Sequence, residues 1–309
     1  MTAPAAAGSA TGEIYDLGYR GYDGPRLGRA HAIRSLFFHS LRSTYGLGRS
    51  TRAKLAPFFL LTFATIPAIA IVAALVLVAR FGGEISEVLG ANSPVRYDTM
   101  FSLLSGAAII SLFCAAQAPE LFGRDQRYGI LSLYFARALR RTDYTLARIV
   151  GFVAALLILL LVPQGVLFLG RVLLAEDIVG AFQRDVGAIP PILAESVLVA
   201  LVYGGLSMTV SAYTPRRAYA VAGIIALFTI PGIITGVVTS LGSSTVGDLL
   251  TLISPGFVLE QINTVLFGVE RSTDLFFVGL PEATYFAAAA VAIVATFGIC
   301  IRRFRQISV

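Results

Sequence analysis

Six apolar stretches without a charged residue constrain the fold of this chain more than any other feature. Each contains about 19 to 24 residues, close to the roughly 20 that a helix needs to cross the hydrocarbon core of a bilayer. Only helices and closed barrels satisfy every backbone polar group in lipid, and these stretches lack the alternation of barrel strands. Their number disfavours the alternative that one or two are buried helices of a soluble protein. The six stretches are Ala56–Ala79, Met100–Ala118, Ile149–Gly170, Ser196–Thr214, Ala218–Thr239 and Ala283–Ile301.

The composition also indicates a membrane protein. Of the 309 residues, 56% are hydrophobic and 14% are charged, against roughly 25% charged in an average soluble domain. We therefore predict an all-α integral membrane protein with six transmembrane helices. Its predicted parts are a disordered or extended cytoplasmic tail at 1–29, an amphipathic connecting helix at 30–55, a transmembrane domain at 56–301 and a cytoplasmic tail at 302–309.

The basic residues predict the orientation of the chain. Of 24 basic residues, 19 lie before the first stretch, between the second and third, between the fourth and fifth, or after the sixth. The positive-inside rule places these segments, and with them both termini, in the cytoplasm. The preference for arginine over lysine, with abundant alanine, is typical of a high-GC genome. We expect a multi-pass protein of the plasma membrane, from a bacterium. The net charge of +6 follows from this topology and gives no reason to expect nucleic acid as a partner.

The sequence predicts no cofactor, metal or nucleotide site in this chain. The two histidines, His31 and His39, have no cysteine or carboxylate cluster near them, as zinc or haem would need. Cys114 and Cys300 fall inside predicted spans, where packing is the expected role. A P-loop needs a lysine that reaches the phosphates, and the single lysine, Lys54, lies in the unrelated context TRAKLAP.

Ion coupling and catalysis also lack their usual signatures. None of the six stretches contains Asp, Glu, His, Lys or Arg, whereas secondary transporters commonly carry ionisable residues inside their spans. Glu120 and Glu195 fall at span ends, where we expect them to reach water or headgroups. Sodium coupling through unwound backbone stays open. The chain therefore predicts a passive pathway that a separate subunit drives from the cytoplasmic face.

The N-terminal basic segment predicts an amphipathic helix from about Ala30 to Leu47. Ile33, Phe37 and Leu41 lie along one broad apolar face, and Arg42 lies on the opposite face. Such a helix is expected at the membrane surface, with its arginines near anionic lipid headgroups. Two interpretations stay open, a lipid-anchored elbow and a lever that carries movement from a cytoplasmic partner.

The loop from Pro119 to Arg148 is the most informative connection. It reads PELFGRDQRYGILSLYFARALRRTDYTLAR, which is long for a loop in a compact bundle. Aromatic residues such as Tyr134 and Phe135 lie among charges of both signs, and such a surface suits docking against another protein. A solvated loop that obeys the positive-inside rule is the alternative, and it explains the arginines but not the aromatics.

The segment before the sixth stretch predicts a short element outside the membrane. Leu249–Gly268 is mostly apolar but is broken by Pro255 and Gly256, so it is too interrupted to span. An external helix or a re-entrant element fits this pattern. It could serve as a cap or gate, or as an interfacial packing helix.

Several motifs resemble the permeases of ABC exporters whose ATPase is a separate chain, the ABC-2-type family. The N-terminal YDLGYRGYDGPRLGR (Tyr15–Arg29) resembles the start of these proteins, and the Pro119–Arg148 loop is similar to their first cytoplasmic loop. Ser254–Pro255 before the last span also looks like the family, and Ala138 departs from it where many relatives have proline. The family's loop pattern of L-x-x-R-x-x-x-R-x-[DE]-Y type is matched by Leu133, Arg137, Arg141, Asp143 and Tyr144.

The resemblance implies an assembly in which two permease subunits, identical or related, bind two ATPase subunits on the cytoplasmic face. The fold would be similar to the membrane domains of ABCG-like half-transporters, and ATP and Mg²⁺ would bind the ATPase partner. Lipid would surround the dimer, and the cargo, taken up between facing apolar helices, would be hydrophobic, such as a drug, an antibiotic or a lipid. An ion-coupled secondary transporter is the competing class, and a scaffold or membrane enzyme is a third.

The resemblance also assigns expected roles to individual residues. A coupling element around Arg124–Leu133 would contact the ATPase, a connecting helix would lie near Ala30–Leu47, and the pathway would lie between the second and fifth helices. Ordinary packing is the alternative for the pathway residues. The expected residues are Glu120, Arg124, Asp125, Arg127, Tyr128 and Leu131 for coupling, Ile33, Phe37 and Leu41 for the connecting helix, and Phe101, Phe113, Phe228 and Ile233 for the pathway.

Overall fold

The structure is a computed structural model that describes residues 24, 27–81, 96–106, 108–136, 139–175, 177–241, 244–269 and 280–307. All regular secondary structure in these ranges is helical, which confirms the predicted all-α class. The predicted tail at 1–29 lies outside the described residues apart from 24 and 27–29. Arg137 and Ala138 of the family-like loop also lie outside them.

In the part of the chain that the structure describes, five helical segments are long and apolar enough to cross a membrane. The fourth predicted stretch belongs to a longer helical segment that starts at α9 (Ile178–Asp185) and passes through the turn η2 (Val186–Ala188). The long helices are α2 (Thr51–Arg80), α8 (Arg141–Leu173), α10 (Ile189–Tyr213), α11 (Arg217–Ser240) and α14 (Glu282–Gln306). Each contains one predicted stretch, except that Thr214, the last residue of the fourth stretch, lies just past the end of α10. The structure thus confirms that these five stretches form helices of membrane-crossing length and apolarity.

The second predicted stretch, Met100–Ala118, is not one straight helix. It falls on α4 (Tyr97–Gly106) and α5 (Ile109–Ala118), whose axes bend by 56° at the break between them. Ala108 has a left-handed backbone with a φ of 56°, a conformation that interrupts a right-handed helix. The described residues thus contain five candidate membrane spans, or six if this bent pair crosses the membrane as one.

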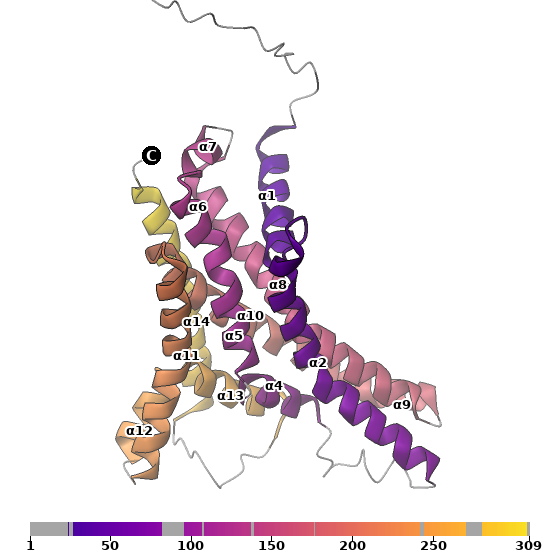
Figure 1. Cartoon of the computed structure of the whole chain (residues 1–309). Coiled ribbons are helices and arrows are strands. Elements are labelled where there is room, and N and C mark those ends of the chain that lie inside the picture. The colour runs from indigo at the N-terminus through magenta and orange to yellow at the C-terminus, as the bar shows by residue number, and fades with distance from the viewer. Residues whose placement is uncertain are drawn as a thin grey trace, which may run out of the picture.

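Helix α8 lies at the centre of the bundle, where it contacts α1 (Gly28–Thr44), α2, α10 and α14 (Figure 1). Its Phe152 and Leu156 side chains are fully buried. Gly204 of α10 allows close approach, because a Cβ atom at that position would lie 3.1 Å from a Val153 methyl carbon. Helices in a bilayer associate through such small residues, since lipid offers no hydrophobic driving force between them.

The predicted connecting helix is shorter than expected and packs along α8. Helix α1 ends at Thr44, a turn with left-handed glycines at 46 and 48 follows, and α2 begins at Thr51. The buried residues of α1 are Leu36, Ser40, Ser43 and Thr44. Ile33, Phe37 and Leu41, the expected apolar face, are half-buried beside this stripe. Small residues therefore hold α1 against α8.

Short helices lie at both ends of the bundle (Figure 1). The π-helical turn η1 (Pro119–Gly123) continues α5 into α6 (Arg124–Arg127), followed by α7 (Leu131–Phe135). At the opposite end, α12 (Ser244–Thr251) and α13 (Pro255–Leu266) form the predicted interrupted element, and Pro255 starts α13. We call these the α6 end and the α13 end.

The outer faces of the bundle expose large apolar side chains, as a lipid or a partner helix would require. On α2 these include Phe59, Phe63 and Ile69, and on α11 they include Ile230 and Ile233. Pro67 and Pro231 lie inside these two helices, and transmembrane helices tolerate such prolines.

We predict that Gly46→Ala destabilises the chain more than Gly48→Ala does. Both glycines have a positive φ, so each alanine pays the left-handed backbone cost of about 1–2 kcal/mol. At Gly46 alone, the new Cβ would lie 2.5 Å from the Ala53 carbonyl oxygen, whereas at Gly48 it would meet open space. Thermal unfolding of the two purified variants in detergent tests this, and equal losses would contradict the predicted clash.

Candidate functional site

A buried ion pair ties α6 to α8 at the α6 end. The Arg148 guanidinium donates to Asp125 Oδ2, and both side chains are only 1% exposed. The Tyr144 hydroxyl donates to the same carboxylate oxygen at 2.7 Å, and Arg148 also donates to the Tyr134 hydroxyl of α7 at 3.1 Å. Asp125 thus accepts two hydrogen bonds, which offset part of the cost of removing its charge from water.

A second ionic network joins the α1–α2 turn to η1 and α11. Glu120 accepts from Arg49 at 2.9 Å and forms an ion pair with Arg217 at 3.0 Å. A third pair, between Arg29 of α1 and Asp143 of α8, is bidentate with distances of 2.6 and 2.7 Å. At this end of the bundle, acidic and basic side chains from segments far apart in sequence therefore form ion pairs with one another.

The expected coupling residues differ in their exposure. Arg127 and Tyr128 are exposed, with Tyr128 at 69%, and Arg124 is half-buried. Glu120, Asp125 and Leu131 are buried. Only the exposed members are positioned to contact another protein directly in this structure.

The aromatic residues of the loop pack inward rather than forming an open docking surface. The rings of Tyr134 and Phe135 lie 5.3 and 5.7 Å from the Tyr144 ring, and Phe304 of α14 lies 5.4 Å from it. The sequence predicts a contact surface that includes these aromatics. In the structure they hold the loop against α8 and α14.

A basic cavity of about 540 Å³ opens between α1, the α1–α2 turn and α6. It is lined by Arg34, Arg42, Arg49 and Arg124 together with both histidines. Partial burial and the charges of Arg148 and Arg124 lower the pKa of His39. This cavity suits an anionic surface, either lipid headgroups or acidic side chains.

The expected pathway residues do not share one surface. Phe101 and Phe113 are buried inside the bundle, where Phe113 packs on Tyr45 and Phe152. Phe228 of α11 is half-buried and stacks on Tyr203, with 4.3 Å between ring centroids. Ile233 of α11 is 59% exposed. Phe101 and Phe113 thus lie in the core of the bundle, whereas Ile233 lies on its outer surface.

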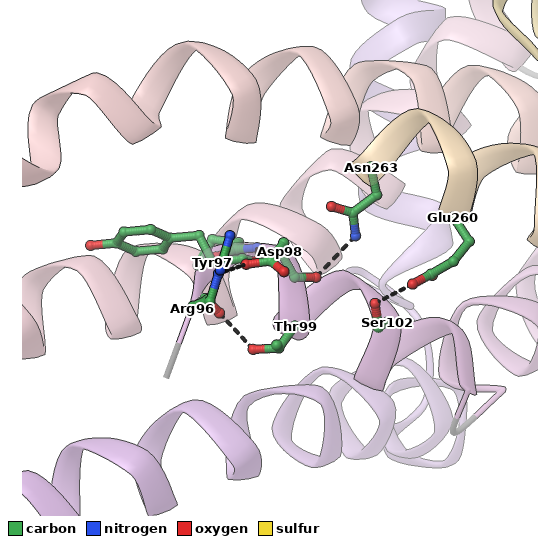
Figure 2. Close-up of polar contacts among 8 residues, drawn as sticks. Arg96, Tyr97, Asp98, Thr99, Ser102, Glu260 and Asn263 are labelled. Atoms are coloured by element: carbon green, nitrogen blue, oxygen red, sulfur yellow. Dashed lines mark hydrogen bonds and ion pairs between the residues drawn. The ribbon is translucent and has the colours of Figure 1, made fainter. Parts of the chain in front are cut away.

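The α13 end holds a polar cluster between α4 and α13 (Figure 2). Ser102 donates to Glu260 Oε1 at 2.6 Å, and the Asn263 amide donates to the Asp98 carbonyl oxygen at 3.0 Å. Arg96 donates to the Asp98 carboxylate at 3.0 Å. These bonds attach α13 to the start of the bent α4–α5 pair.

The expectation that Glu120 and Glu195 reach water or headgroups is wrong. Glu120 is 8% exposed and Glu195 is 1% exposed. Helix α10 begins at Ile189, with Pro190 and Pro191 in its first turn, so Glu195 lies in its second turn. The two prolines are the signal that places the helix start before Glu195, because proline favours the first helical positions.

No protein-family model matches this chain, and no curated protein matches it. Within the described ranges, no group of three or more His, Cys, Asp and Glu residues is arranged to hold a metal ion. Cys114 and Cys300 are both buried and free.

Proposed function

We propose that this chain is the permease subunit of an ATP-driven ABC exporter, working as a dimer with separate ATPase subunits. In this proposal the bent α4–α5 pair counts as the sixth span, and the α6 end faces the cytoplasm. ATP and Mg²⁺ bind the partner subunit, which supplies the energy. The ABC-2-type loop motifs support the family, and the α6 end supports the coupling mechanism.

One observation carries the proposal. The short charged helix α6 is exposed on one side, and on the other side a buried ion pair attaches it to the long helix α8. Arg127 and Tyr128 are available to a partner, while Asp125, on the same turn, is paired with Arg148 of α8. Because interiors are close-packed and resist deformation, a push on α6 is transmitted to α8 rather than absorbed by the loop.

The exposed face of α11 supports a pathway between two copies of the chain. Ile233 and its neighbours Ile230 and Val237 are exposed and apolar, and helices that line such a pathway face a partner rather than their own bundle. A second copy that presents the same face would enclose an apolar volume. Hydrophobic cargo fits that lining.

We predict that Arg127→Glu uncouples the transporter without unfolding it. The exposed Arg127 side chain forms no ion pair within the described residues, so charge reversal acts on a partner and leaves the fold intact. Like charges placed together across an interface cost several kcal/mol. The amount of the ATPase subunit, expressed from a neighbouring gene, that co-purifies with the chain should therefore fall about tenfold or more. Co-purification and ATPase activity in lipid measure this effect.

The matched control is Arg184→Glu on α9, which is exposed and lies far from α6 (Figure 1). It should retain the ATPase at the wild-type level. Equal losses in both variants would point to a general charge effect. A chain that purifies without any ATPase would overturn the proposal.

An ion-coupled secondary transporter is the second candidate, and the burial of Glu195 in α10 favours it. Ionisable groups buried at membrane depth commonly mark ion or proton pathways. Transport that persists without an ATPase and follows an ion gradient would establish this candidate.

A further inference from the structure

A small cavity at the α13 end contains two carboxyl groups. It is formed by α4, α5, α10 and α13, and its volume of about 10 Å³ matches roughly one water molecule. Glu195 of α10 and Glu260 of α13 line it from two elements far apart in sequence. The remaining walls include the Tyr203 and Ser105 side chains and the Phe101 ring.

Glu195, which lines this cavity, has a carboxyl oxygen without a hydrogen-bond partner in the part of the chain that the structure describes. Its Oε2 atom is buried and has no hydrogen-bond partner among the described residues, and the residue is 1% exposed. A buried polar atom without a partner is rare and costly, and an unpaired buried charge is costlier still. Such an atom normally has a ligand, a proton or a water molecule that satisfies it.

The surroundings of the cavity add negative rather than positive charge. Glu260 accepts a hydrogen bond from Ser102 but forms no ion pair within the described ranges. Asp98 of α4 is the next acid, and its carboxylate is already paired with Arg96. Tyr203 is the other titratable group that lines the cavity. Two ionised carboxylates in this cavity would therefore lack a counter-charge.

Burial raises the pKa of Glu260, the hydrogen bond from Ser102 acts against this shift, and the negative charge of Asp98 adds to it. The site thus favours an added positive charge on geometric and electrostatic grounds together. A group of one-water size is the largest that the cavity admits. A proton or one dehydrated alkali-metal ion meets both conditions.

We propose that this cavity is a binding site for one monovalent cation, held between the carboxyl groups of Glu195 and Glu260. The bound cation is either a proton or a single alkali-metal ion. Occupancy holds α13 against α10 and α4, because it removes the repulsion between acids on facing elements. The site does not depend on an ATPase partner and is open to test on this chain alone.

The test is the apparent melting temperature of the full-length chain in detergent, measured from about pH 5 to pH 8.5 in choline, sodium or potassium chloride at fixed ionic strength. Suppose that a carboxyl group stays protonated in the folded chain but ionises in the unfolded chain above its ordinary pKa of about 4.3. The folded state of the chain then becomes less stable as the pH rises. In choline, the wild-type melting temperature should therefore fall by about 3 °C or more across this range. Glu195→Gln should flatten the curve.

The salts distinguish the two cations. If sodium or potassium binds, it should restore the wild-type melting temperature at high pH but not that of Glu195→Gln. If only a proton binds, neither salt should differ from choline. Glu282→Gln, at an exposed glutamate in the first turn of α14, is the control. Whatever its own melting temperature, it should show the same dependence on pH and salt as wild type.

A pH and salt dependence shared by wild type and Glu195→Gln would overturn the proposal. Should Glu195→Gln fail to fold, Glu260→Gln provides the same comparison from the other side of the cavity. Infrared spectra of the wild-type chain give a second readout, since a proton site requires a protonated-carboxyl band that disappears as the pH rises. A wild type whose spectrum and stability respond to neither pH nor salt would also exclude the site.

Discussion

Arg148→Ala should destabilise the folded chain by about 3–5 kcal/mol, because it leaves the Asp125 carboxylate buried without its counter-ion. Arg148 and Asp125 are each 1% exposed, so water cannot replace the lost partner without opening the α6 end. The Tyr144 hydroxyl would still donate to Asp125, but one neutral hydrogen bond does not offset a buried charge. We expect a loss of monodisperse protein on size exclusion and a large fall in melting temperature.

The double variant Asp125→Leu/Arg148→Met separates the cost of an unpaired charge from the value of the pair. Replacing a buried ion pair by apolar residues of similar volume is often neutral or stabilising, so the double variant should recover most of the stability. If α6 moves α8 through this pair, the recovered protein should still show weakened coupling to its ATPase. An Arg148→Ala variant that melts within 1 °C of wild type would contradict the buried-pair argument.

The long helices were predictable because a helix that crosses a bilayer must be long and apolar, and both properties can be read directly from the sequence. Ala56–Ala79 and Ile149–Gly170 fall inside α2 and α8. The bend within Met100–Ala118 was not predictable in this way, since hydropathy carries no information on the dihedral angles of Ala108. The end of α1 at Thr44 was also missed, although Gly46 and Gly48 mark the turn that follows.

The candidate sites were only partly predictable, because they depend on tertiary pairing. Asp125 and Arg148 are 23 residues apart, and nothing in their local sequence pairs them. Glu195 was assigned to a span end because an uncharged stretch must stop at the first charge. The helix itself starts six residues earlier, which brings Glu195 into the bundle opposite Glu260. Counting charges therefore finds where lipid-facing segments end, but it does not find ionisable groups that the bundle encloses.

Gly151→Leu should separate α1 from α8, at a cost of about 1–3 kcal/mol for the overpacked contact. A Cβ atom at Gly151 would lie 2.6 Å from the Ser40 Cβ and 3.0 Å from the Phe37 carbonyl oxygen. The second of these atoms belongs to the backbone and cannot move aside as a flexible side chain could, so α1 itself must shift. We expect a lower melting temperature and faster proteolytic cleavage within α1.

Gly165→Leu provides the matched control, because it makes the same substitution on the same helix where a new Cβ meets no atom within 4 Å. Leucine also favours a helix over glycine by about 0.8–1 kcal/mol, so this variant should equal or exceed wild type in stability. Equal losses at 151 and 165 would mean that α8 tolerates leucine at neither glycine for reasons unrelated to α1. A loss at 151 alone, together with weakened ATPase coupling in a chain that still inserts, would make the α1–α8 contact part of the path by which the α6 end moves the membrane helices.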